Sequence, residues 1–179
     1  MTINSELSKI NQDSGLVELF TLDCSSLGGA TYYFTSNYYT DGSVVEWQGN
    51  TYTFIPIQSS GWETLGSTNQ GAATQPTPSI TVSNVNKVLL TAVVSLGNIV
   101  GAKVTRYRTF QKFLDGQPSA DSTQYVGPDV YYVNQKTTHT KNQITFQLIN
   151  PIDMPGKQLP ARQVLKDGLY PFPGVLVYR

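Results

Sequence analysis

The chain has 179 residues, a formal net charge of zero, one cysteine and one histidine. A neutral chain lacks the basic surface that duplex nucleic acid requires, one cysteine excludes an intrachain disulfide, and one histidine excludes a His-based metal cluster. No secretory signal is visible, and the longest apolar run, 88–96, is too short to span a bilayer. We therefore expect a soluble protein made in a cytoplasm, without specific nucleic-acid binding or membrane insertion.

The first third of the chain predicts a short helix followed by strands. Ile3, Leu7 and Ile10 fall at helical spacing, which predicts a helix over 3–12 within an N-terminal segment 1–15. Alternating apolar residues and turn dipeptides then predict short strands, the later ones joined in an antiparallel meander. These predicted strands are 17–22, 31–34, 44–47 and 51–57.

Residues 58–78 are rich in Gly, Ser, Thr, Gln and Pro, which predicts a long loop. Trp62 and Leu65 are its only large apolar residues. Ordering such a loop costs roughly 1 kcal/mol or more per residue. Burial of Trp62 on a neighbouring subunit would offset part of that cost, and backbone pairing with a neighbouring sheet edge would offset more. We therefore interpret the loop as an assembly arm. The alternative is that Trp62 folds back on its own core.

The middle of the chain predicts more strands around one helix. Residues 86–96 are apolar on both sides, with Asn84 or Asn86 able to cap the start and Gly97 able to end it, which predicts a helix packed on the sheet. The remaining predicted strands are 79–85, 101–113, 130–133 and 142–148.

The fold class predicted is mainly β (α+β). We expect an antiparallel β-barrel or sandwich over 16–149, either as one unit or as two β-subdomains meeting near 97–103. Five prolines in 150–179 exclude a long helix or a central strand from that segment.

Residues able to carry catalysis are few and scattered. His139 lies in a polar turn, Cys24 stands alone at a strand end, and the acidic residues sit singly beside Gly, Ser or Pro, where Asp caps turns. Motifs for phosphate, dinucleotide or nucleophilic-serine sites are missing from the sequence. We predict that the protein is not an enzyme and holds no metal.

One basic cluster, Lys103 to Lys112, lies on a predicted strand. Arg106 and Arg108 share one face of this strand, and Tyr107 lies on the other. The cluster fits a solvated strand face, a phosphate contact, or ion pairs with a partner protein. With the loop residues, the candidate interface set is Trp62, Leu65, Arg106, Arg108 and Tyr107.

Five stretches of sequence together carry a family resemblance. They are GGATYYF (28–34), VEWQGNTYTFIPIQSSGWE (45–63), PTPSITVSNV (76–85), GNIVGAKVTRYRTFQKFLD (97–115) and FQLINPIDMPGKQLPARQ (146–163). Their order and spacing resemble the minor tail protein L family of lambda-type phages, from about residue 16 to residue 179. The most specific part is the WQG-x-x-Y motif followed downstream by the TVSN segment.

The resemblance implies a structural subunit of the tail tip, within the virion and assembled in the host bacterial cytoplasm. Relatives form a ring that joins the distal tail protein and tail tube to the central fibre or hub protein, with the tape-measure protein in the lumen. A homotrimer is preferred and a hexamer is the alternative, because tail tips reduce six-fold symmetry to three-fold. The ring domains of relatives resemble the β-barrel of tube proteins.

The sequence departs from the family pattern at its C-terminal end. Many relatives carry a Cys-rich segment that binds an iron–sulfur cluster, whereas this sequence stops near where that segment would begin and has only Cys24. A cluster needs several thiolates, so we expect none and no other cofactor.

Two other functions remain open from the sequence. The first is a carbohydrate- or receptor-binding β-module, in which Trp62 and the Tyr-rich strands would stack on sugar rings. The second is a tail-associated peptidase or muramidase, which would need a cleft with convergent titratable groups.

Overall fold

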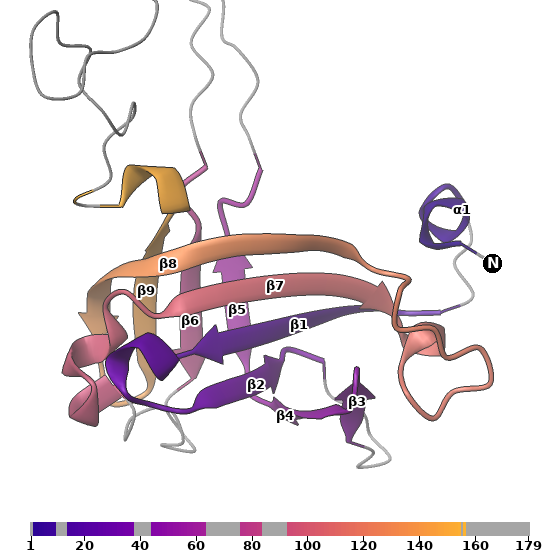
Figure 1. Ribbon diagram of the computed structural model, residues 1–179, viewed down its shortest axis with the longest axis horizontal. Coiled ribbons are helices and arrows are strands. Elements are labelled where there is room, and N and C mark those ends of the chain that lie inside the picture. The colour runs from indigo at the N-terminus through magenta and orange to yellow at the C-terminus, as the bar shows by residue number, and fades with distance from the viewer. Residues whose placement is uncertain are drawn as a thin grey trace, which may run out of the picture.

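A computed structural model describes residues 2–9, 14–37, 44–63, 76–83, 93–154 and 156 (Figure 1). Its elements in chain order are α1 (Ile3–Leu7), β1 (Leu16–Asp23), η1 (Ser25–Leu27), β2 (Thr31–Thr35), β3 (Val45–Trp47), β4 (Asn50–Phe54), β5 (Ile57–Ser60), β6 (Ser79–Ser83), η2 (Gly97–Ile99), β7 (Lys103–Phe110), η3 (Gln111–Phe113), β8 (Val126–His139), β9 (Gln143–Ile149) and η4 (Pro151–Asp153), where η marks a 3-10 helix. Within these residues, no helix is long and apolar enough to cross a membrane.

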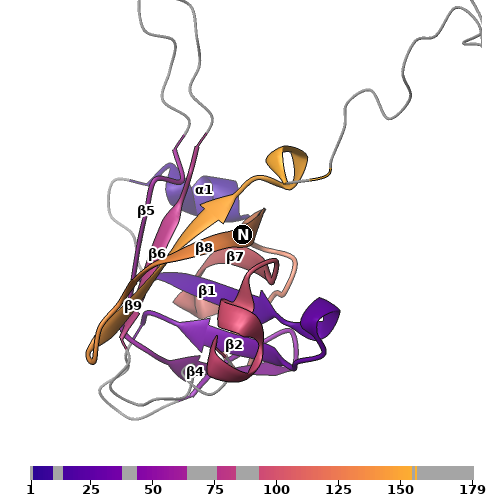
Figure 2. The ribbon, with the colours of Figure 1, turned by 90° about the vertical axis from the view of Figure 1, so that its left-hand side faces the viewer.

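All nine described strands belong to one mixed sheet in the order β3-β4-β2-β1-β7-β8-β9-β6-β5. The long strands β1, β7 and β8 run across the molecule in Figure 1, and β9, β6 and β5 cross them steeply. The side view in Figure 2 shows these two groups as the walls of a folded sheet. The fold is mainly β, as predicted, but the predicted barrel is wrong because β3 and β5 remain as two unjoined edges.

The predicted antiparallel meander is also wrong. β4, and not β3, lies beside β2, and the two run parallel with Phe34 opposite Thr53. β3 pairs antiparallel with β4 on the outside. A tight hairpin therefore adds to the sheet as a unit, and the strand that returns from its turn is the one that meets β2.

The dipeptide Ile55-Pro56 splits the predicted strand 51–57 and carries the chain between the two ends of the sheet. The Ile55 N–H donates to the Thr35 carbonyl oxygen (3.0 Å), and the Ser83 N–H donates to the Pro56 carbonyl oxygen (2.9 Å). Proline has no N–H for a continued ladder, so the strand ends here. The sheet consequently curls around an interior core.

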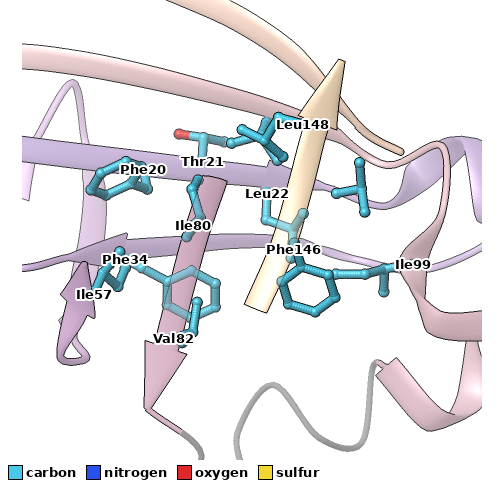
Figure 3. Close-up of a pocket in the computed structure, with 12 residues that line it drawn as sticks. Phe20, Thr21, Leu22, Phe34, Ile57, Ile80, Val82, Ile99, Phe146 and Leu148 are labelled. Carbon is cyan, nitrogen blue, oxygen red and sulfur yellow. The ribbon is translucent and has the colours of Figure 1, made fainter. Parts of the chain in front are cut away.

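This interior core is apolar and contains a small cavity. Side chains from both walls of the sheet meet there, among them Phe20, Leu22 and Phe34 from one wall and Ile80 and Phe146 from the other (Figure 3). The cavity has a volume of about 40 Å³ and walls that are almost wholly apolar. An apolar void of this kind offers water no hydrogen bonds and stays dry.

A second core covers the opposite face of β1. Val17 and Leu19 pack there with Trp47 and Tyr52, whereas Phe20 and Leu22 point into the interior core. β1 is therefore buried on both faces, because side chains alternate along a strand. A third, smaller cluster joins Ile3 of α1 to Phe110 and Phe113.

Several predicted boundaries change in the structure. The helix expected over 3–12 spans Ile3–Leu7, with 10–13 outside the described residues. Of the helix expected over 86–96, residues 93–95 are helical and 84–92 lie outside the described part. The loop predicted to start at residue 58 starts later, because β5 pairs with β6 through Ser60. The division into segments 1–15, 16–149 and 150–179 stays a prediction.

Candidate functional site: the open sheet edge and its charged groove

The concave face of the sheet changes from apolar to charged along β1 and β7. The pairs across these strands are Leu22 with Val104, then Phe20 with Arg106, then Glu18 with Arg108. At the charged end lies a groove of about 610 Å³. We call this the charged groove; it is lined by Glu18, Ser59, Ser60, Gly61, Trp62, Glu63, Pro76, Thr77, Arg106, Arg108 and Asp129.

Arg106 forms ion pairs with two carboxylates at the floor of the charged groove. Its side chain is 7% exposed and donates to Asp129 Oδ2 from Nη2 (2.9 Å) and from Nε (3.1 Å). Its Nη1 lies 3.5 Å from Glu18 Oε1. A buried guanidinium is stable only when carboxylates compensate its lost hydration, as these two do. Arg106 is therefore an internal ion-pair partner and not a solvated or phosphate-binding residue.

Gly127 brings Asp129 beside Arg106. Its φ is +110°, and a Cβ at this position would lie 3.0 Å from both the Arg106 carbonyl oxygen and the Asp129 nitrogen. Only glycine fits such a close approach at positive φ without strain. The register between β7 and β8 shifts between Arg106 and Arg108, so the strand bulges at this point.

Two donors beside the groove have no acceptor within the described residues. They are Arg108 Nε and Trp62 Nε1, both buried. The Arg108 side chain is 35% exposed, and its Nη2 lies 3.9 Å from Asp129 Oδ2. A buried donor without a partner costs about 1–3 kcal/mol, so an incoming acceptor would be favourable here.

Trp62 lies on its own core at the boundary between the apolar and charged parts of the concave face. Its ring centroid is 6.5 Å from that of Phe20 and 5.4 Å from that of Tyr131, and the Arg106 guanidinium carbon lies 4.0 Å from it. The structure thus matches the alternative in which Trp62 folds back. Its ring remains partly exposed and still lines the groove, and an assembly role stays a prediction.

The predicted interface residues do not all meet. Trp62, Arg106 and Arg108 come together in the charged groove, whereas Leu65 lies outside the described residues. Tyr107 lies on the opposite face, 5.0 Å from Trp47 between ring centroids, and burial followed by the nearby Tyr125 raises its pKa. Strand alternation placed these side chains as the sequence indicated.

The two edges of the sheet differ in how they are covered. At β3, the Asp115 N–H donates to the Glu46 carbonyl oxygen (3.0 Å), and the Gly49 N–H donates to Asp115 Oδ2 (2.9 Å). Gln48 Nε2 also donates to the Ser122 carbonyl oxygen (3.1 Å). The segment after η3 therefore covers this edge.

At β5, no described residue bonds to the outer side. The Ser83-to-Pro56 bond fixes which residues face β6, because bonded pairs alternate in an antiparallel ladder. Gln58 and Ser60 face β6, so the N–H and C=O groups of Ile57 and Ser59 point away from it. β5 is the open edge in the part of the chain that the structure describes.

The remaining chemical candidates do not form a reactive site. His139 is exposed at the end of β8, with Nδ1 3.3 Å from Lys136 Nζ. Cys24 is buried, and burial followed by Asp23 raises the pKa of its thiol. Asp23 and Asp121 cap turns by accepting backbone N–H groups of Ser25 and Thr123, as predicted.

An iron–sulfur cluster of the kind expected for relatives does not fit these residues. Among the residues described, no three His, Cys, Asp or Glu side chains gather at a metal-binding distance. The chain has one cysteine, which lies within the core, and a cluster needs several thiolates.

Sequence reasoning missed the partners of Arg106 and the open edge. Asp129 and Glu18 lie far from Arg106 in the chain, and only sheet pairing brings the three together. The segment Gly127-Pro128-Asp129 within a strand was the available signal, since glycine and proline inside a strand mark a bulge.

Comparison with known proteins identifies the family. Residues 25–171 match the family described as phage minor tail protein L. The chain belongs to this family. It is also 28% identical over 169 residues to tail tip protein L of Escherichia phage lambda, covering 92% of this chain and 70% of that protein. Family membership identifies this chain as a structural protein of a phage tail.

Proposed function

We propose that this chain is a ring-forming subunit of the tail tip of a long-tailed phage with a non-contractile tail. The ring joins the distal tail protein and tail tube above to the central fibre or hub protein below. The tape-measure protein occupies its lumen. The subunit is made in the host bacterial cytoplasm and becomes part of the virion.

The observation that carries this proposal is family membership over most of the chain, together with the edge that β5 leaves open among the described residues. The lambda relative is named as a tail tip protein, and the match spans all the strands described after β1. An open edge without a charged guard invites pairing with another chain. A chain of zero net charge also lacks the repulsion that would oppose close packing of copies.

The ring contains three copies in our proposal, with six as the alternative. A ring arises when one surface of each copy binds a different surface of the next, and it closes when the rotation between copies is a whole fraction of a turn. The sheet has two unlike edges and so offers unlike surfaces. No iron–sulfur cluster or other cofactor takes part.

A carbohydrate-binding module is the competing function, and the site does not favour it. Sugar stacking needs an open aromatic face, and the Arg106 guanidinium already lies 4.0 Å from the centre of the Trp62 ring. Tyr107 packs against Trp47 on the other side of the sheet, away from the charged groove.

A reconstruction of the phage particle tests the proposal. We expect three copies of this chain in a ring at the distal end of the tail tube, in contact with the distal tail protein and the central hub. Density for this chain anywhere else in the virion, or a dimer as its only assembled form, contradicts the proposal.

A further inference from the structure

We propose that the open edge of β5 and the charged groove receive residues 174–178 of a second copy of this chain as an added strand. The inference rests on the ring proposed above and assigns the contact that would build it. The groove of about 610 Å³ lies at the Ser59 and Ser60 end of β5. A second hollow of about 430 Å³ lies at the other end, beside Pro56 and Ile57.

The outward N–H and C=O groups of β5 can pair with an added strand. Ile57 and Ser59 present N–H and C=O groups outward, and no described residue bonds to them. The strand Ile57-Gln58-Ser59-Ser60 has no lysine, proline or bulge of the kind that guards natural sheet edges. Main-chain bonds along such an edge bind an extended peptide, and adjacent pockets select its side chains.

The position of the chain's last described element supports this occupant. The end of β9 lies against the start of β6, because the Leu148 N–H donates to the Pro78 carbonyl oxygen (2.8 Å), and η4 follows directly. Residues 157–179 continue from there, and at about 3.3 Å per extended residue they reach roughly 70 Å. That length is ample for a neighbouring copy.

The sequence of this segment suits the role. The segment 174–178 contains two valines and a tyrosine, residue types that favour a strand. A second copy, and not the same chain, is the proposed donor because the ring proposed above requires a contact between copies.

The charges of the two partners also match. The charged groove holds three carboxylates, of Glu18, Glu63 and Asp129, against the two guanidinium groups of Arg106 and Arg108. The guanidinium group of Arg179, directly after this segment, is a suitable partner for the third carboxylate. The carbonyl oxygens of the added strand also supply acceptors for Trp62 Nε1 and Arg108 Nε, which find none among the described residues.

The contact would be heterologous, because the surface that gives the strand differs from the surface that receives it. Head-to-tail contacts of this kind close into rings when the geometry allows. The outer side of β5 in each copy would then be paired.

Disulfide trapping with the full chain tests the proposal directly. Protein carrying Ser59→Cys is mixed with protein carrying Val177→Cys under mild oxidation, so that only a contact between copies can link them. We expect a linked pair on a non-reducing gel, and no link when Ser26→Cys, on exposed η1, replaces Ser59→Cys. Cys24 is buried and serves in each protein as the same internal background. Linking no greater than that of the Ser26→Cys control overturns the proposal, as does a disulfide found only within a doubly substituted chain.

A second pair of variants tests whether the outward N–H of Ser59 takes part in the contact. Ser59→Pro removes the outward N–H while leaving the bonds of β5 to β6, and Ser59→Val keeps the N–H. We expect Ser59→Pro to weaken self-association about tenfold or more in sedimentation and Ser59→Val to leave it unchanged. Equal association of the two variants overturns the proposal. If a reconstruction shows the ring but the Ser59–Val177 link does not form, this contact is wrong and the proposed function still stands.

Discussion

The two edges of the sheet differ in what their outer backbone groups contact. β3 is a three-residue strand whose Glu46 carbonyl oxygen accepts from the Asp115 N–H in the segment after η3. In the turn after β3, the Gly49 N–H and the Gln48 side chain also bond to that segment. β5 is an uncharged strand whose outer backbone has no described partner, and it adjoins the charged groove. Within the described residues, the chain therefore covers one edge and leaves the other open, and the open edge is where we propose that a partner binds.

If the proposals above hold, this difference separates folding from assembly within one sheet. The covered edge sits over the second core, which holds Trp47, Tyr52 and Leu114, so its integrity contributes to the stability of the monomer. The open edge adjoins a groove in which Arg106 is paired with carboxylates, whereas Trp62 Nε1 and Arg108 Nε find no acceptor among the described residues. Substitutions at the two edges should therefore change different measured quantities.

The largest expected effect follows from emptying the core beneath the covered edge. Trp47 is 0% exposed, so Trp47→Ala should lower the free energy of unfolding by about 3–5 kcal/mol. Urea unfolding followed by circular dichroism measures the loss. Val44→Ala is the control, because Val44 is 60% exposed and should cost less than about 0.5 kcal/mol. A similar loss from both variants would mean that β3 is not supported by this core.

The next effect comes from the floor of the charged groove. Arg106→Met should lower the free energy of unfolding by roughly 2 kcal/mol, because it leaves Asp129 and Glu18 facing each other without their cation. Arg108→Met is the matched control and should cost less, since its side chain is more exposed. In the Arg106→Met background, Asp129→Asn should then restore stability; a further loss would contradict this ion-pair assignment.

A smaller effect is expected when one bond beside the covered edge is removed without disturbing the core. Asp115→Ala removes the acceptor for the Gly49 N–H and should cost about 1 kcal/mol in urea unfolding. The Asp115 N–H still donates to the Glu46 carbonyl oxygen of β3, so the edge stays covered and association in sedimentation should not increase. Asp115→Asn keeps an acceptor oxygen and should behave like the parent protein. An equal loss of stability from both variants would show that the bond to Gly49 is not its cause.

The smallest effect concerns α1, whose Ile3 packs on Phe110 at the end of β7 and Phe113 of η3. Hydrogen bonds from Lys112, then from Lys9, hold the pKa of Glu6 below its ordinary value of 4.5. A lowered folded pKa gives stability that is complete above the ordinary value and lost as pH falls through the lower folded one. Amide exchange in α1 should therefore accelerate on acidification from about pH 6 to about pH 3 beyond its intrinsic pH dependence. Glu6→Gln should remove this additional pH dependence of amide exchange. If the additional dependence persists in Glu6→Gln, a group other than Glu6 causes it.

The sequence alone predicted most of the strands and the two faces of β7. Alternation along 103–110 places Arg106 and Arg108 on one face and Tyr107 on the other, and the structure agrees. Turn chemistry was nearly as informative, since Asp23 and Asp121 cap turns as expected. These features depend on residues close together in the chain, where periodicity and side-chain type decide the outcome. The family resemblance, carried by motifs in order, was confirmed in the same way.

Tertiary structure decided which strands and which side chains are neighbours. The parallel contact of β4 with β2, the crossing at Ile55-Pro56 and the two unjoined edges follow from how strands pair across long separations. The local sequence pattern does not determine such pairing, because many strand orders bury the same apolar faces equally well. The same reason explains the charged groove. Arg106 finds Asp129 and Glu18 only because β7 lies between β8 and β1, and Trp62 meets that guanidinium only because the sheet curls back over its own concave face.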